Sequence, residues 1–335
     1  MLVQRLRTEP VPPIVISKSP DIIQSLACYL AGDVKEDKFL TPTALNTYLD
    51  CPLSFYYKYV LGVREREEVS PDFNALLFGN ILHKAMEIIY GEIAESGGGL
   101  ITAGSIENQQ SKIDTAVGKC FAMQFGIGRA EDFRFEGRNV LGREIITRMI
   151  RRIMEIDAAY APFTIQGLEK RMISRVTVSG NGKSFTVNIR GIIDRIDSRN
   201  GKVRIVDYKS GRDFRQFNSV EALFGEEEDK RNKAVFQTLF YSMALAEAEK
   251  MDRPAIPCLY NSREIYLEDF DPMLRMGPDK DPVIPDQSIL KEQILPEFRK
   301  RLEGLLLEIF DPAVPFRHRE EGRECPFCQR AGFPT

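Results

Sequence analysis

The chain has 335 residues, of which 43% are hydrophobic and 28% are charged, the proportions of a soluble globular protein. Its net charge of −3 excludes an overall basic coat for nucleic acid but leaves room for a local basic patch. No stretch approaches the roughly 18 apolar residues of a membrane helix, and the proline-broken start is no secretory signal. We therefore expect a cytoplasmic protein of one large or two ordinary domains, without a Walker A or GxGxxG nucleotide motif.

The beginning of the chain predicts an arm followed by helices. Residues 1–40 are rich in proline and then carry a short apolar helical stretch, which we interpret as an arm or linker. A helix is predicted to begin with Thr41 as its N-cap and Pro42 at its first position, and Cys51 opens a second, aromatic-rich helix in the same way. A long helix with apolar residues at helical spacing then carries His83.

The pattern changes from helical to strand-like after the first half of the domain. It stays helical over residues 41–162 and then takes the period of two that is typical of strands. Three strands are expected in RMISRVTVSG, SFTVNIRGIIDRIDS and KVRIVDYKSG, joined by Asn-Gly turns that favour tight hairpins. An amphipathic helix, one or two strands and a closing helix follow. Residues 41–335 therefore predict an α/β domain whose mixed central sheet and flanking helices occupy residues 163–335.

Two acids and a lysine stand at the ends of apolar strands. Asp194 and Asp207 lie on strands joined by a hairpin, so their side chains can converge, and Lys209 shares a strand face with Asp207. Carboxylates that meet in this way raise each other's pKa unless a cation neutralises them. Mg²⁺ or Mn²⁺ would explain the pattern and could activate water beside a phosphate. Surface carboxylates in salt bridges with Arg195 and Arg204 are the alternative, and spacing alone does not decide.

Four motifs in order give the stretch a resemblance to a known family. Asp194 and Asp207 stand 13 positions apart in GIIDRID and VDYKSG, which resembles the signature of the PD-(D/E)XK nucleases in their RecB-type branch. That branch also carries an upstream FG…H helix and a downstream Q…Y helix. Here these are FGNILH, with His83, and QTLFY, with Gln237 and Tyr241. The resemblance implies a restriction-endonuclease-like core with an N-terminal helical insertion.

The resemblance also implies roles for individual residues. The implied metal ligands are His83, Asp194, Asp207 and the backbone carbonyl of Tyr208. Lys209 would be the catalytic lysine, and Gln237 and Tyr241, one helical turn apart, would position DNA or that lysine. Some relatives carry a further acid before the first strand, where this chain has Glu169. Outside this context His83 would be a satisfied buried histidine, and the Gln–Tyr pair would be ordinary helix-surface residues.

Six cysteines are few for a disulfide scaffold of this length. The segment DCPLSFYYKYVLG is similar to the N-terminal cysteine segment of AddB-type subunits and of CRISPR-associated RecB-like exonucleases. In those families one upstream and three C-terminal cysteines hold a [4Fe–4S] cluster. Zinc on the same ligands and free thiols are the alternatives. The matching residues are Cys51, Cys325 and Cys328. The resemblance leaves the fourth ligand unidentified: Cys28, Cys120 or Cys258 could substitute, as could a cysteine lost through truncation.

A run of arginines on the helix before the strands predicts where DNA binds. Nothing in the sequence indicates base readout, so we expect backbone contact with single- or double-stranded DNA without sequence specificity. A solvated helix face is the alternative. The candidates are Arg148, Arg151, Arg152 and Arg212, with Arg143, Arg215 and Lys209 as further members of the same basic set.

Taken together, the resemblance implies a metal-dependent DNA exonuclease of the AddB-like kind that processes DNA ends in recombination or repair. A helicase or motor subunit is the expected partner, and the proline-rich start suggests a piece of a larger helicase-like polypeptide. Two alternatives remain: a free-standing exonuclease of the CRISPR-adaptation type, and a non-catalytic DNA-binding scaffold domain. The scaffold predicts a broken acidic set, whereas Asp194, Asp207 and Lys209 are all present.

Overall fold

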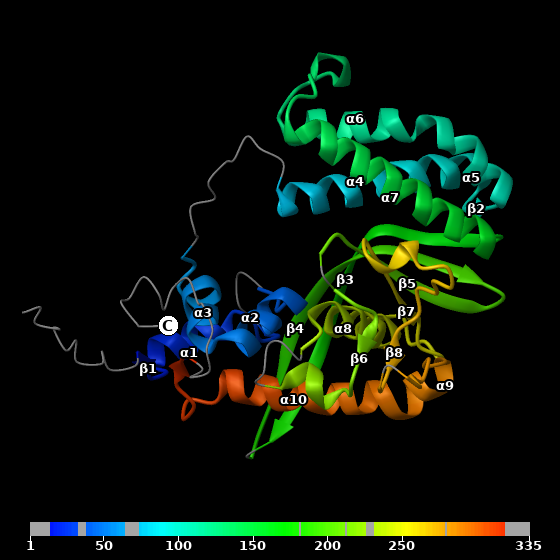
Figure 1. Ribbon diagram of the computed structural model, residues 1–335. Coiled ribbons are helices and arrows are strands. Elements are labelled where there is room, and N and C mark those ends of the chain that lie inside the picture. Colours follow the sequence, from blue (N-terminus) through cyan, green and yellow to red (C-terminus); the bar gives the residue numbers. More distant parts are fainter. Residues whose placement is uncertain are drawn as a thin grey trace, which may run out of the picture.

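A five-stranded mixed sheet forms the centre of the fold (Figure 1). Its order is β2-β3-β4-β5-β7, in which only the β5–β7 pair is parallel. The strands are β2 (Leu100–Ile101), β3 (Phe163–Gly180), β4 (Lys183–Arg199), β5 (Lys202–Lys209) and β7 (Ile256–Asn261). This computed structural model describes residues 14–32, 38–63, 74–180, 182–211, 213–225, 231–278 and 280–318.

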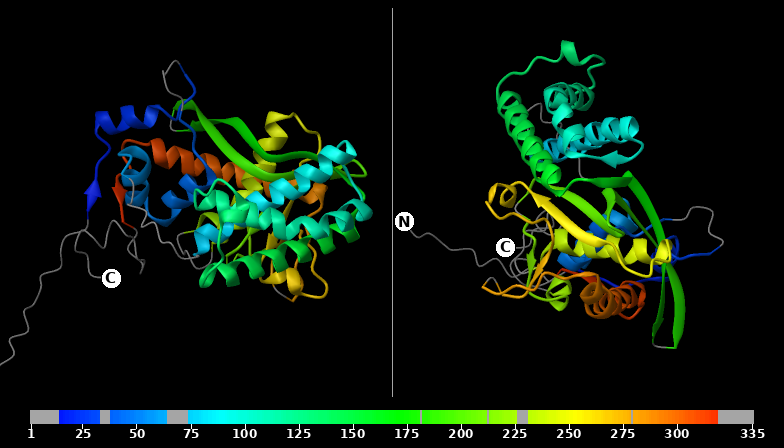
Figure 2. Two further views of the ribbon diagram at one scale, coloured as in Figure 1. Left: turned by 90° about the horizontal axis from the view of Figure 1, so that it is seen from above. Right: turned by 90° about the vertical axis from the view of Figure 1, so that its right-hand side faces the viewer.

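Helices cover the sheet in two groups (Figures 1 and 2). The group α4 to α7 lies above the sheet in Figure 1, whereas α8 packs below it against β3, β5 and β7, and α10 packs against β3 and α8. None of the described helices is both long and apolar enough to span a membrane. The helices are α1 (Pro20–Ala27), α2 (Pro42–Asp50), α3 (Pro52–Phe55), α4 (Ala75–Gly97), α5 (Ala103–Gln109), α6 (Ile113–Gln124), α7 (Arg138–Tyr160), α8 (Lys233–Ala248), α9 (Gln287–Ile289) and α10 (Leu295–Phe310).

The helix starts follow the capping rules that the sequence predicts. Thr41 accepts a hydrogen bond from the backbone N–H of Ala44 at 3.1 Å and so caps α2. Cys51 caps α3 in the same manner through its sulfur. Asn74 caps α4, the long helix that carries His83. Both predicted helix starts are therefore confirmed.

The strand region agrees with the sequence at the β4–β5 turn but not at its beginning. Asn200 and Gly201 have φ values of 51° and 73°, as the predicted tight β4–β5 hairpin requires. β3 starts at Phe163, earlier than predicted, so Glu169 lies inside the strand and not before it. A register shift next to Gly167 and a φ of 45° at Glu169 interrupt the alternation of β3, which hides its first half in the sequence.

The described part of residues 1–40 belongs to the fold, which corrects the expectation of an arm. β1 (Val15–Ile16) pairs with β9 (Phe316–Arg317), and single bridges join Leu30 and Leu40 to β4. These pairings are too short to leave a strand pattern in the sequence. The remaining two-stranded sheet pairs β6 (Gln216–Phe217) with β8 (Arg275–Met276).

Candidate active site

The two predicted acids meet where β4 and β5 separate. The β4–β5 ladder ends with Arg195 opposite Val206, and the next residue on each strand is one of the acids. Asp194 Oδ2 accepts a hydrogen bond of 2.8 Å from the backbone N–H of Tyr208. Asp194 is 8% exposed and Asp207 is fully buried. Burial of two carboxylates is costly unless cations or donors compensate, so their partners define the site.

A lysine and an amide hold the Asp207 carboxylate. Lys209 Nζ lies 2.9 Å from Asp207 Oδ2, and Gln237 Nε2 donates to Asp207 Oδ1 at 3.0 Å. Lys209 also donates to Gln237 Oε1 at 3.3 Å, and Gln237 Nε2 lies 3.0 Å from the Tyr241 hydroxyl. The structure thus brings together the lysine, its acid and the Gln–Tyr pair of α8, and Gln237 orients the first two.

A histidine from α4 and an acid from β3 complete the group around Asp194. His83 Nδ1 lies 3.1 Å from Asp194 Oδ2. One donor atom each of His83, Asp194 and Glu169 lie within 4.8 Å of one another. An imidazole and carboxylates match the ligand preference of Mn²⁺ and, in their oxygens, of Mg²⁺. Glu169, a minor candidate in the sequence, therefore lies beside the histidine, whereas Asp207 is held by its lysine and amide.

Charges crowd the site enough to shift several pKa values. Burial lowers the pKa of His83, but Asp194 and Asp207 outweigh it and raise that pKa to about 9. Burial and the charge of Asp194 raise the pKa of Glu169 to about 7. Burial raises the pKa of Asp207 to about 6, although Lys209 opposes the rise. Burial lowers the pKa of Lys209, but the two aspartates outweigh it, so the lysine stays charged. Such a cluster favours a bound cation.

The two arginines of the salt-bridge alternative point elsewhere. Arg195 forms a bidentate pair with Asp157 of α7, with Nη–Oδ distances of 2.7 and 3.0 Å, and Arg204 pairs with Asp197 at 2.8 Å. Arg195 also donates to the hydroxyl of Tyr208 at 2.9 Å. The alternative of two surface carboxylates paired with these arginines is therefore wrong. The hydroxyl of Tyr208 is part of this buried network, whereas its backbone N–H donates to Asp194 in the site. Metal binding by the Tyr208 carbonyl stays a prediction.

The arginines of α7 are in part already paired with an acid. Arg151 lies 2.8 Å and Arg143 3.5 Å from carboxylate oxygens of Asp114 on α6. Arg148 is exposed. Arg215 is buried against Glu264 and so does not line a surface groove. DNA binding by the α7 set stays a prediction. Arg212, Cys325 and Cys328 lie outside the described residues.

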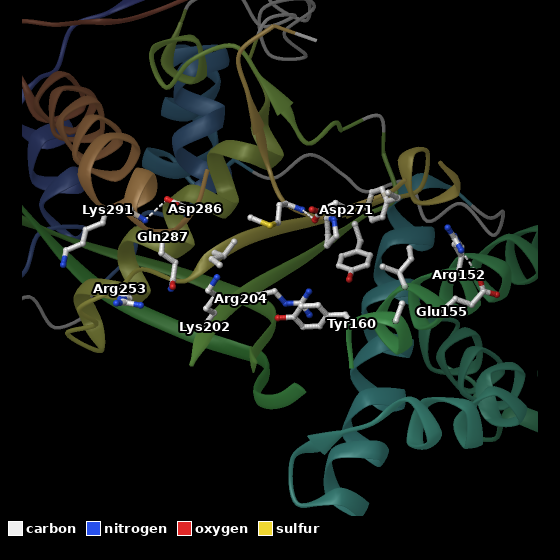
Figure 3. Close-up of a pocket in the computed structure, with 18 of the residues that line it drawn as sticks. Arg152, Glu155, Tyr160, Lys202, Arg204, Arg253, Asp271, Asp286, Gln287 and Lys291 are labelled. Atoms are coloured by element: carbon white, nitrogen blue, oxygen red, sulfur yellow. Dashed lines mark hydrogen bonds and ion pairs between the residues drawn. The ribbon is translucent and has the colours of Figure 1, made fainter. Parts of the chain in front are cut away.

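A cavity of about 1030 Å³ lies away from the acids (Figure 3). Arg152, Tyr160 and Arg204 line it, and Lys202 marks its position at the start of β5, the end opposite Lys209. Arg152 therefore faces this cavity. A separate hollow of about 520 Å³ opens at His83 and Glu169, between the start of α4 and Ser210. The second hollow gives access to the site.

Cys51 is buried beside His318, the last residue that the structure describes. Its sulfur accepts from the N–H of Ser54 at 3.4 Å and lies 3.4 Å from Nδ1 of His318, just after β9. Sequence reasoning missed His318, although the chain has only two histidines. Cys120 on α6 and Cys258 on β7 are buried in other elements.

Comparison with known proteins agrees with this geometry. The model of the PD-(D/E)XK nuclease superfamily matches residues 40–332. Over 186 residues the chain is 32% identical to a subunit of the ATP-dependent helicase/deoxyribonuclease of Carboxydothermus hydrogenoformans, covering 52% of this chain and 16% of that protein. The corresponding protein of Streptococcus agalactiae is 26% identical over 223 residues, covering 61% and 18%. That of Clostridium perfringens is 26% identical over 300 residues, covering 86% and 24%.

The chain thus spans between 16% and 24% of the length of these relatives. The family model, by contrast, covers nearly the whole described region, including all the acids, the histidine and the lysine of the site. The chain belongs to the PD-(D/E)XK nuclease superfamily.

Proposed function

We propose that the protein is a metal-dependent exonuclease that hydrolyses phosphodiester bonds at DNA ends during recombination or repair. The observation that carries this proposal is the convergence of His83, Glu169 and Asp194 beside the Asp207–Lys209 pair. The relatives named helicase/deoxyribonuclease support DNA as the substrate and a motor subunit as the partner. We propose that the protein carries out this role in the cytoplasm, since the role does not require a membrane.

The residues present fit a divalent ion. Mg²⁺ or Mn²⁺ bound here would activate water and stabilise charge on the phosphate. His83 must be neutral to act as a ligand, whereas its aspartate neighbours raise its pKa to about 9, so the ion would displace a proton. Lys209 is held in its charged form and would neutralise the negative charge that develops on the phosphate. Gln237 keeps the lysine at that position.

We include Glu169 among the metal ligands, beside the implied His83, Asp194 and Asp207. Glu169→Gln is expected to weaken Mn²⁺ binding by about tenfold or more, because an amide replaces one anionic ligand of the group. Titration calorimetry of the metal-free protein measures the affinity. Glu87→Gln is the matched control, since Glu87 lines the same hollow without joining the group. Equal Mn²⁺ affinity in the Glu169→Gln and wild-type proteins would remove Glu169 from the ligand set.

Linear and circular DNA separate an exonuclease from an endonuclease. The proposal predicts that linear single strands are degraded with Mg²⁺ while closed circles of the same sequence survive. Labels at the 5′ and 3′ ends give the polarity, which separates an AddB-like module from a free-standing exonuclease of the CRISPR-adaptation type. Cleavage of circles at the rate of linear DNA would contradict the exonuclease assignment. Binding without cleavage of either would favour the scaffold alternative.

We also propose that Cys51, Cys325 and Cys328 hold a [4Fe–4S] cluster. Two observations support it: the β1–β9 pair joins the two ends of the described chain, and Cys51 is buried next to them. His318, with Nδ1 at 3.4 Å from the Cys51 sulfur, is a nitrogen donor for the fourth position. Thiolate and imidazole also bind zinc, so metal analysis has to distinguish the two metals.

Protein purified without oxygen is therefore expected to contain iron. Cys51→Ser should lose it, whereas Cys120→Ser should keep it, because Cys120 is buried in the hydrophobic core on α6, which packs against α4 and α7. Elemental analysis for iron and zinc provides the measurement. A wild-type protein that carries zinc, or no metal at this site, would refute the cluster.

A further inference from the structure

All the charged residues in the segment between Glu169 and Asp194 are basic. Residues 170–193 contain five lysines and arginines and no aspartate or glutamate, in a chain whose net charge is −3. The segment follows Glu169 directly and ends just before Asp194. It forms most of the β3–β4 hairpin, which extends from the site past α10 (Figures 1 and 2). Its basic residues are Lys170, Arg171, Arg175, Lys183 and Arg190.

One face of this hairpin is packed and the other is open. Met172, Val176 and Val178 are buried on the side that α8 and α10 cover. Most of the residues between them on β3 are exposed, and so is part of β4. We call this surface the ribbon face and define it by Arg171, Ile173, Arg175, Arg190 and Ile192.

Arginines and isoleucines alternate across the ribbon face. Arg171 pairs with Ile192 and Ile173 with Arg190 in the strand register. The two isoleucines are 48% and 50% exposed, so they offer apolar contacts beside the arginines. Arg190 lies over the ring of Phe39 at 5.4 Å. The result is a surface with charged and apolar contacts side by side.

The charges of the ribbon face are not neutralised by neighbours. Among the described residues, no carboxylate forms a salt bridge with Arg171 or Arg175, and both are exposed. The α7 arginines differ, since Arg151 and Arg143 both pair with Asp114. Exposed guanidinium groups without acidic partners create a local positive potential that attracts a polyanion.

Distances along the strand suit a nucleic-acid backbone. Strand residues rise about 3.3 Å each, so Arg171 and Arg175 lie about 7 and 20 Å from Glu169 along β3. Phosphates of one B-form strand are about 3.4 Å apart along the axis, so this stretch covers about six steps, or fewer if the strand is extended. The ribbon face could therefore contact several phosphates upstream of the bond that is cut.

We propose that the ribbon face binds a single DNA strand and leads it to the acids of the site. The apolar side chains favour a single strand, because unpaired bases can pack on Ile173 and Ile192 while a duplex presents mainly phosphates. The contacts are with backbone and base faces, so they carry no sequence preference. The identity of the polymer rests on the proposed nuclease function.

Two double variants with the same change in charge test the proposal. Arg171→Gln/Arg175→Gln is expected to weaken binding of a fluorescent 20-nucleotide oligo-dT about tenfold and to reduce the slope of log K against log salt by about 1.4, since single strands lose about 0.7 per contact. Arg129→Gln/Arg134→Gln, in the exposed segment between α6 and α7, should stay within about twofold of wild type. Ile173→Ala/Ile192→Ala should weaken binding of oligo-dT but not of a blunt duplex. All binding is measured in EDTA, and thermal unfolding confirms that these exposed changes leave the fold intact.

The outcomes separate this proposal from that of the nuclease. Equal losses in the two arginine variants, or no loss in either, would overturn the ribbon face as the binding surface. Tighter binding of the duplex, lost in the Arg171→Gln/Arg175→Gln protein, would overturn the single-strand assignment. Binding through the ribbon face by a protein that never cuts DNA would support the proposal and reject the nuclease function. An Arg171→Gln/Arg175→Gln protein that binds DNA with wild-type affinity and cuts it would overturn the ribbon face and support the nuclease function.

Discussion

Lys209→Ala is expected to slow DNA cleavage by roughly 100- to 1000-fold, the usual cost of removing one preorganised charge or donor from a transition state. The Lys209 side chain is 20% exposed, and Asp207 and Gln237 hold its ammonium group within 3.3 Å. Its loss should leave Mn²⁺ affinity and DNA affinity within a few fold of wild type, because the lysine is not a ligand. Single-turnover cleavage with saturating protein measures the chemical step.

The control for this variant is Lys202→Ala. Lys202 is the first residue of β5, and it is exposed at the end of the strand opposite Lys209. The control should cleave within about twofold of wild type. If Lys209→Ala cleaved as fast as Lys202→Ala, the lysine would have no part in the reaction.

Arg195→Met is expected to lower the free energy of unfolding by about 3–5 kcal/mol, the usual cost of breaking a buried ion pair. Arg195 is fully buried and lies between Asp157 and Asp197. Burial raises the pKa of Asp157, but the arginine outweighs it and holds that pKa below its usual value. Without the guanidinium, the buried Asp157 loses its main cation, and Asp197 keeps Arg204 alone. Urea denaturation of the metal-free protein measures the change.

Two further variants control for the loss of an arginine as such. Arg175→Met, on the exposed face of β3, should change the free energy of unfolding by less than about 0.5 kcal/mol. Asp157→Leu/Arg195→Met removes both partners and should cost less than the two single changes added together. An Arg195→Met protein as stable as Arg175→Met would show that the buried network contributes nothing to the fold.

The buried network and the site share the same two strands. Arg195 follows Asp194 directly, and Tyr208 stands between Asp207 and Lys209. Successive strand residues point to opposite sides, so one side of each strand carries the residues of the site and the other side carries the residues of the buried network. The hydrogen bond from Arg195 to the Tyr208 hydroxyl, 2.9 Å long, joins the two strands just behind the acids. The network therefore supports the position of the acids as well as the stability of the sheet.

Local patterns explain why much of the fold could be predicted. The Asn200–Gly201 turn sets the β4–β5 hairpin, and that hairpin brings Asp194 and Asp207 to one place. The cap at Thr41 likewise depends only on residues within one turn. Capping, turns and alternation act between neighbours in sequence, so the chain itself carries them.

Contacts between distant segments could not be predicted in the same way. The partner of Arg195 is Asp157, which is 38 positions away on a helix, and His318 lies 267 positions from Cys51. The sequence pattern places Glu169 outside the strand because its positive φ breaks the alternation that marks β3. Its place beside His83 depends on how α4 crosses the end of the sheet, which no local pattern encodes.

Degradation of end-labelled linear single-stranded DNA, with Mg²⁺, with EDTA and after Mg²⁺ is restored, tests the central claim most directly. Asp194→Asn, which alters the acid shared by the histidine and the backbone of Tyr208, is assayed beside the wild type. The account predicts cleavage with Mg²⁺, none with EDTA, recovery on restoring the metal, and little or none in Asp194→Asn. Cleavage that persists in EDTA or at full rate in Asp194→Asn, or a wild-type protein that binds the DNA and leaves it intact with Mg²⁺, would contradict it.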